Sequence, residues 1–335
     1  AISKADICIL TSNSFDDLLA RCPNKSLGIQ ARAEGSLSDL TIDYCNLSMP
    51  QSIDLRLHGT VRQLLSDKKR NGQIHYATTL KDVRFANNLI PHGLRQTIRI
   101  PNNIQVGGDI SFSGSTYTLT RNTVYHGGGS MAFSGSFSAR SMSYAGRLQA
   151  NRFPLHAFMP SMNLSPLTAT FNIKGHGTDF MSGGTNVTAR GAIASFAYDG
   201  IPLDGVSLDA DLKGTQAHAV LLSDNRWLKA NLNITAAKNG HETSVALNGN
   251  IDQFSLNLGK TLKPGEDPTD LTLIMGIDLQ ARFNDKTNAV AVAGTIDPLN
   301  AITSSMGFPG GSLQIDFFTD DHSTNARLSS GDMAI

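Results

Sequence analysis

The chain has 335 residues, with 28 basic and 28 acidic side chains and a formal net charge of zero. This balance argues against nucleic-acid binding and against attachment to anionic membranes, because both functions depend on excess basic charge. Charged residues make up only 17% of the chain, and 31 glycines accompany many Ser, Thr and Asn residues, a composition typical of strands and turns.

The first stretch predicts a short helix over residues 14–20, where Ser14 and Asp17 resemble a capping box. No apolar run reaches the ~18 residues of a membrane-spanning helix, and the chain opens without a signal-peptide pattern. We therefore expect any anchor or export signal to have been removed.

The chain has an odd number of cysteines: Cys8, Cys22 and Cys45. This favours three buried thiols but leaves open the possibility that two of them form one disulfide.

Apolar residues at every second position are the main signal in the rest of the chain. This period is typical of strands with one apolar and one solvated face, and it predicts an all-β protein with an antiparallel sheet. The alternating segments, in chain order, lie at residues 53–57, 110–112, 131–137, 169–173, 206–212, 228–234, 271–279 and 313–317.

Turn and loop signals separate these segments at short intervals. Turns are predicted at 71–72, 127–129, 183–184, 199–200 and 239–240 because of their Asn-Gly, Asp-Gly and Gly-rich sequences. Two polar stretches, 66–73 and 261–270, are predicted loops, and the second is a candidate module boundary. Pro298 in a first-turn position predicts a second short helix over residues 297–306.

Motifs for catalysis or metal binding do not find the context that they need. His126-Gly127-Gly128-Gly129 matches an oxyanion loop, but the chain has no G-x-S-x-G motif and strand alternation resumes at Met131, which favours a hairpin turn. The nine histidines show no metal-ligand spacing, and Asp209 and Asp211 alternate with apolar residues on the polar side of a strand. We expect no enzyme activity, no metal site and no cofactor.

The segment from residue 148 to residue 260, with the few residues just before it, carries a pattern that resembles the AsmA-like and TamB-like superfamily of bacterial envelope proteins. The pattern includes the segments 144–160, 164–169, 175–179, 196–198, 205–212, 223–225 and 247–254, and weaker similarity extends over most of the chain. The resemblance implies one continuous elongated region over 1–335, built as a curled, groove-forming antiparallel sheet of many short meandering strands. It also implies an internal fragment of a longer protein, located in the periplasm and lacking the family's inner-membrane anchor.

The resemblance implies further that the apolar groove shields phospholipid acyl chains during lipid transport between the inner and outer membranes, or assists outer-membrane assembly. An outer-membrane barrel protein of the BamA/TamA type is the implied protein partner. The predicted groove residues are Leu55, Leu57, Phe112, Phe133, Phe137, Phe171, Ile173, Leu208, Leu212, Leu232, Leu247, Leu273 and Ile277.

The same apolar stripe is compatible with a closed sandwich core. A tandem β-sandwich that binds glycan or protein at a cell surface is therefore the alternative, although the single tryptophan, Trp227, offers little aromatic surface for stacking on sugars.

Overall fold

The computed structural model describes residues 26–36, 38–83, 97–179, 181–257, 270–303 and 307–330. The chain forms two compact units. The first unit contains residues 1–170 and 196–200, and the second contains residues 171–195 and 201–335.

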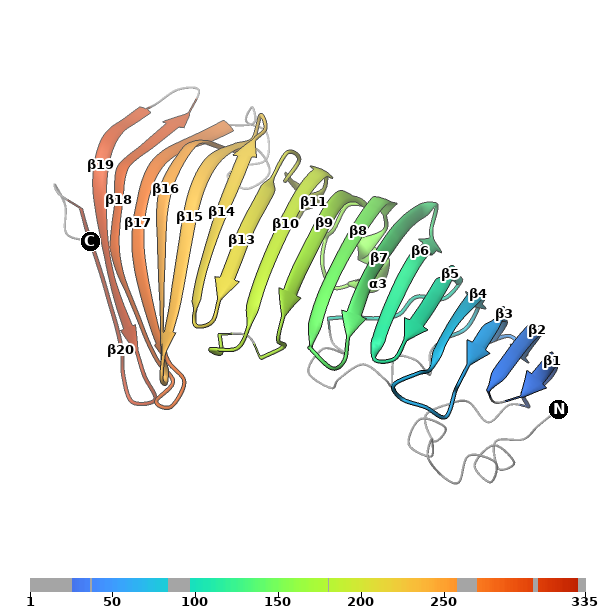
Figure 1. Cartoon of the computed structure of the whole chain (residues 1–335). Coiled ribbons are helices and arrows are strands. Elements are labelled where there is room, and N and C mark those ends of the chain that lie inside the picture. Colours follow the sequence, from blue (N-terminus) through green and yellow to red (C-terminus); the bar gives the residue numbers. More distant parts are fainter. Residues whose placement is uncertain are drawn as a thin grey trace. The chain divides into compact units, whose positions relative to one another are not determined.

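The first unit is a ladder of strands that lie side by side in chain order (Figure 1). Each strand from β1 to β8 pairs antiparallel with the next. The strands are β1 (Gly28–Ser36), β2 (Asp39–Met49), β3 (Ile53–Arg62), β4 (Asn71–Leu80), β5 (Ile104–Ser113), β6 (Thr116–His126), β7 (Gly129–Ser138) and β8 (Ser143–Phe153).

The second unit repeats this arrangement, and its strands from β15 to β19 are longer than any in the first unit. From β13 to β20 each strand again pairs antiparallel with the next, and β10 pairs with β13. The strands are β10 (Asn186–Ser195), β13 (Ser207–Lys213), β14 (Gln216–Asp224), β15 (Leu228–Asn239), β16 (Glu242–Asn257), β17 (Asp270–Asn284), β18 (Ala289–Thr303), β19 (Gly307–Thr319) and β20 (Thr324–Ser330). Strand β9 (Leu167–His176) lies between β8 and β10 in the chain. The two short strands β11 (Ala197–Tyr198) and β12 (Ile201–Pro202) lie between β10 and β13 in the chain and pair with each other.

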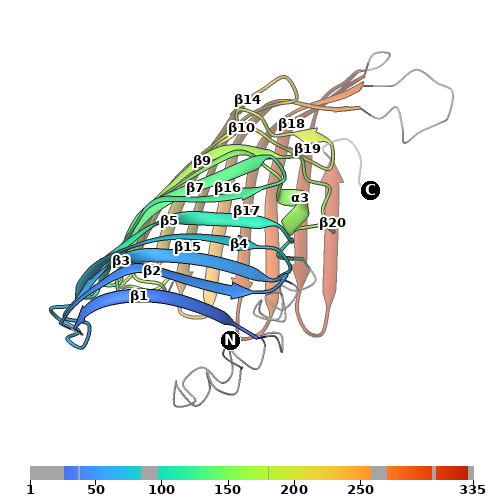
Figure 2. The same ribbon diagram turned by 90° about the vertical axis from the view of Figure 1, so that its right-hand side faces the viewer.

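The prediction of an all-β meander is confirmed, since eighteen strands belong to one antiparallel sheet. In the part of the chain that the structure describes, the only helix is α3 (Leu155–Phe158), which the sequence did not predict. It lies beside the ends of the first unit's strands (Figure 2). The helix predicted over 14–20 falls outside the described residues. So does the loop predicted over 261–270, except for its last residue, Asp270, which begins strand β17.

The helix predicted from Pro298 is wrong, because residues 297–303 continue strand β18. Leu299 pairs with Met275 and Ala301 with Leu273, so the apolar side chains of this segment gain cross-strand neighbours. Pro298 lies between Ile296 and Leu299, where the register shifts and the ladder does not need its missing N–H.

Four of the five predicted turns are confirmed, and the fifth is wrong. Residues 127–128, 183–184, 199–200 and 240–241 form turns, whereas Asn71 and Gly72 begin strand β4, so the preceding loop covers residues 63–70 instead of the predicted 66–73. Gly72 pairs with Phe112 of β5, and the Phe112 ring covers the position that a Cβ would occupy. Gly72 therefore serves side-chain packing rather than chain reversal.

A conventional core is confined to the ends of a few strands. Among the described residues, nine apolar side chains are buried, and they include Ile104, Phe153 and Leu164. The rings of Phe153 and Phe158 of α3 stack with centroids 5.0 Å apart, and the Arg99 N–H donates to the Phe158 carbonyl at 2.7 Å. So few buried side chains indicate that, among the described residues, no second layer covers most of the sheet in either unit.

Candidate functional site

The register of the first unit places its apolar side chains on one face. Directly paired residues of antiparallel strands share a face, and Leu55 pairs with Leu47, Phe112 with Tyr117, and Phe133 with Leu148. We call this surface the first apolar face; it comprises Ile29, Leu47, Leu55, Leu57, Ile74, Tyr76, Val106, Ile110, Phe112, Tyr117, Leu119, Val124, Met131, Phe133, Phe137, Tyr144 and Leu148.

The opposite side of these strands is polar. On β7 and β8, for example, Ser134 pairs with Arg147 and Ser136 with Ala145, while Gln149 pairs with Ala132. The two faces therefore differ sharply in polarity, as the alternation in the sequence predicted.

The second unit has an equivalent surface, which we call the second apolar face. Leu208 pairs with Leu221, and Leu221 pairs in turn with Leu232. The face comprises Val187, Leu208, Leu212, Leu221, Leu228, Leu232, Ile234, Val245, Leu247, Ile251, Phe254, Leu271, Leu273, Met275, Ile277, Leu279, Val290, Val292, Ile296, Leu299, Leu313, Ile315 and Phe317.

Phe171 joins the second apolar face through a glycine. A Cβ on Gly191 would lie 2.7 Å from the Phe171 ring, and Gly191 pairs with Leu208 of that face. Ile173 lies two residues further along β9 and so shares the face with Phe171. Each of the thirteen predicted groove residues therefore lies on the apolar face of its own unit.

These side chains are only partly covered. None of the thirteen is buried, and Phe137, Phe171, Ile173 and Leu208 are 37–42% exposed. Leaving apolar surface in water costs about 25 cal/mol per Å². Two extended apolar faces with partly exposed side chains are therefore the feature of this fold that most calls for a ligand or a partner.

Polar groups on the first apolar face find partners within it. Asn122 is fully buried, accepts a hydrogen bond from the Tyr76 hydroxyl at 2.8 Å, and donates to the carbonyls of Asp109 and Thr120. Burial raises the pKa of Tyr76, which keeps its phenol neutral. Apart from the Tyr144 hydroxyl, which is buried without a hydrogen-bond partner, this face offers little polar recognition.

A cluster of charged groups on the polar side braces β4, β5 and β6. The Asp109 carboxylate is 5% exposed and is held by His75 Nδ1 at 2.8 Å and by Arg121 Nε at 2.8 Å. The hydrogen bond from His75, followed by that from Arg121, lowers the pKa of Asp109. Every charged atom here is engaged in holding strands together.

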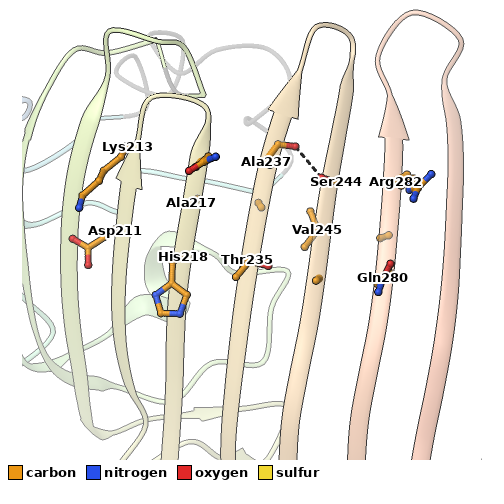
Figure 3. A pocket seen from close by; sticks show the side chains of 14 residues that line it. Asp211, Lys213, Ala217, His218, Thr235, Ala237, Ser244, Val245, Gln280 and Arg282 are labelled. Atoms are coloured by element: carbon orange, nitrogen blue, oxygen red, sulfur yellow. Dashed lines mark hydrogen bonds between the residues drawn. The ribbon is translucent and has the colours of Figure 1, made fainter.

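A hollow of about 740 Å³ lies on the polar side of the second unit. Figure 3 shows Asp211, Lys213, His218 and Thr235 around it, on three neighbouring strands. Asp211 accepts a hydrogen bond from Thr188 at 2.8 Å, and Asp209 pairs with Arg190 at 2.8 Å. Both carboxylates lie on the polar face, as predicted, and their bonds are strand-to-strand contacts.

A smaller hollow of about 170 Å³ lies on the second apolar face. Its lining includes Val187, Leu212 and Ile234, with alanines between them that leave room above the sheet. The volume is well below the ~300 Å³ of a typical small-molecule site, so it accommodates a short apolar segment rather than a whole ligand.

Several members of the two faces were missed by the sequence analysis. Tyr76, Leu119, Val124 and Leu148 belong to the first face, and the register shift between Leu119 and Asn122 hides two of them. A bulge inserts one extra residue into a strand, so beyond it the apolar face continues at the other set of alternate positions. Counting every second residue therefore fails across a bulge.

Among the described residues, no three His, Cys, Asp or Glu side chains gather in a way that could hold a metal ion. The described helix is too short to cross a membrane. Cys45 carries a free thiol, while Cys8 and Cys22 fall outside the described residues.

In comparisons with protein-family models, curated proteins and solved structures, nothing matches this chain.

Proposed function

We propose that the two apolar faces shield lipid acyl chains, in the manner implied by the resemblance to AsmA-like and TamB-like envelope proteins. The observation that supports this proposal most directly is the partial exposure of all thirteen predicted groove residues on faces with few polar groups. An acyl chain contributes about 0.8 kcal/mol per buried CH₂ and needs no hydrogen-bond donors.

The periplasmic location, the transport between inner and outer membranes and the partner of the BamA/TamA type belong to the same proposal. The tandem β-sandwich is less favoured, because the apolar side chains of a sandwich core are buried between two sheets, whereas Phe137 and Leu208 remain exposed.

Lipid extraction from the gently purified protein tests this proposal with a matched pair of variants. Phe133 and Leu148 face each other on the first apolar face, and their neighbours Ala132 and Gln149 face each other on the polar side. Substituting Asp at Phe133 and Leu148 places two charges under the bound chains, whereas Asp at Ala132 and Gln149 places the same two charges in solvent.

We expect phospholipid to copurify with the wild type and with the Ala132→Asp/Gln149→Asp variant. The Phe133→Asp/Leu148→Asp variant is expected to lose most of it, about tenfold or more, because a carboxylate loses its hydration against an acyl chain. Circular dichroism confirms that both variants keep their strands. A wild type without lipid, or equal loss in both variants, contradicts the proposal.

A further inference from the structure

The turns at one end of the first unit's strands form a linked edge. Backbone hydrogen bonds join the Gln63 N–H to the Ser38 carbonyl, the Gly114 N–H to the Arg70 carbonyl, and the Ala139 N–H to the Ser115 carbonyl. We call these four turns (residues 38, 63–70, 114–115 and 139–142) the turn edge; several lie toward the left of Figure 2. It is separate from the apolar faces, which lie along the strands.

The loop between β3 and β4 exposes two leucines at this edge. Leu65 is 82% exposed, the highest value among the described large apolar residues, and its neighbour Leu64 is 42% exposed. The loop is held in place by its base. The Ser66 N–H donates to the Gln63 carbonyl, and the Arg70 guanidinium donates to the Gly114 carbonyl at 3.0 Å and to the Tyr117 hydroxyl at 2.7 Å. The two leucines therefore lie on a loop whose base is fixed by hydrogen bonds.

Basic residues lie along this edge even though the whole chain is neutral. Lys68 and Lys69 follow the leucines in the same loop, and Arg140 lies two turns further along the edge, in the turn between β7 and β8. None of the three forms an ion pair with another described residue, whereas Asp67, the loop's own acid, lies 3.8 Å from Arg70. Met142, 37% exposed, adds a further apolar side chain beside Arg140.

We propose that the turn edge docks on an anionic lipid bilayer, with Leu64 and Leu65 entering the interface and Lys68 and Lys69 contacting the headgroups. Apolar side chains flanked by basic ones are the combination that binds membrane surfaces, since insertion and attraction to anionic lipids act together. This local surface qualifies the expectation drawn from the net charge, because a neutral chain can still gather cations at one edge. The proposal does not depend on lipid binding at the apolar faces.

A vesicle-flotation assay of the full chain tests this docking proposal. It compares vesicles of phosphatidylethanolamine and phosphatidylglycerol with neutral phosphatidylcholine vesicles. Two loop variants, Leu64→Ser/Leu65→Ser and Lys68→Glu/Lys69→Glu, are compared with a control, Leu222→Ser/Lys286→Glu. The control changes one exposed leucine and one exposed lysine of the second unit.

We expect the wild type and the control to float with the anionic vesicles. We expect 0.5 M salt to release them, because it shortens the Debye length to about 4 Å and so screens the attraction to the headgroups. Each lysine near the surface contributes about fivefold to binding, so the lysine variant, which replaces two of them with acids, is expected to bind at least about 25-fold more weakly. The leucine variant is expected to bind about tenfold more weakly.

Unchanged melting temperatures show that the variants fold, and unchanged lipid content of the purified protein separates this surface from the apolar faces. The proposal is overturned if the wild type fails to bind anionic vesicles. It is equally overturned if the control weakens as much as the loop variants, or if binding requires an added protein instead of lipid.

Discussion

At the scale of single residues, glycines create the space into which phenylalanine rings fit on the apolar faces. The Phe171 ring lies over Gly191, and the Phe112 ring lies over Gly72 of the adjacent strand. The sequence predicted the rings on the correct faces, but it could not predict which glycines lie beneath them, because that depends on the pairing of strands.

Replacing Gly191 with alanine is expected to displace the Phe171 ring, since the new Cβ would lie 2.7 Å from a ring carbon. We expect a loss of about 1 kcal/mol in the free energy of unfolding, measured by urea denaturation. In a Phe171→Ala background the same substitution should cost much less. Gly183→Ala, which meets nothing within 4 Å, is the control; an equal effect in both backgrounds would refute the packing argument.

Asp109 makes the stability of the sheet depend on pH. Because His75 and Arg121 lower its pKa in the folded state, folding favours the ionised carboxylate. Its contribution to stability is therefore complete above the unfolded pKa of about 3.9 and is lost as the pH falls through the lower folded value.

The Asp109→Asn variant should accordingly melt below the wild type at pH 7, and the difference in melting temperature should close as the pH falls below about 4. Thermal unfolding followed by circular dichroism between pH 7 and pH 2 measures it. Asp278→Asn, at an exposed position on β17, is the control and should track the wild type. A difference that stays constant with pH would show that the carboxylate's charge is not involved.

At the scale of elements, bulges decide how much of each strand could be predicted. Uninterrupted alternation identified most strands, whereas register shifts between Ile251 and Phe254 and between Ile296 and Leu299 break the pattern. The second of these made a strand resemble a helix start at Pro298. Local sequence cannot resolve such sites, because the cross-strand partners supply the stabilisation.

Gly249 shows how tightly neighbouring strands approach. Its φ is 146°, and a Cβ there would meet the Asn231 carbonyl oxygen of β15. Gly249→Ala should lower the free energy of unfolding by about 1–3 kcal/mol, because the backbone must move or strain. Gly311→Ala, also in a strand but with nothing within 4 Å of its Cβ, should be close to neutral in the same urea titration. Equal costs for the two would contradict this account of the close approach.

At the scale of the whole molecule, the sequence predicted the all-β class, the meander and the two-sided character of the strands. It could not decide between an uncovered face and a sandwich core, because the same alternation serves both, and the decision rests on which sheets pack together. The partial exposure of Leu208 and Phe137 supports the proposal that these faces bind a ligand. That inference is the basis of the proposed lipid-shielding function.

The central claim is tested most directly by photo-crosslinking along one strand. On β15, Leu232 and Ile234 belong to the second apolar face, while Asn231 and Asn233 alternate with them and lie on the polar side. A photo-reactive phenylalanine analogue is placed at each of the four positions in turn, and adducts formed in cells are identified by mass spectrometry. The account predicts lipid adducts at 232 and 234 and none at 231 and 233. Lipid adducts at all four positions, or at none of them, would contradict it. Protein adducts instead of lipid adducts at 232 and 234 would contradict it as well.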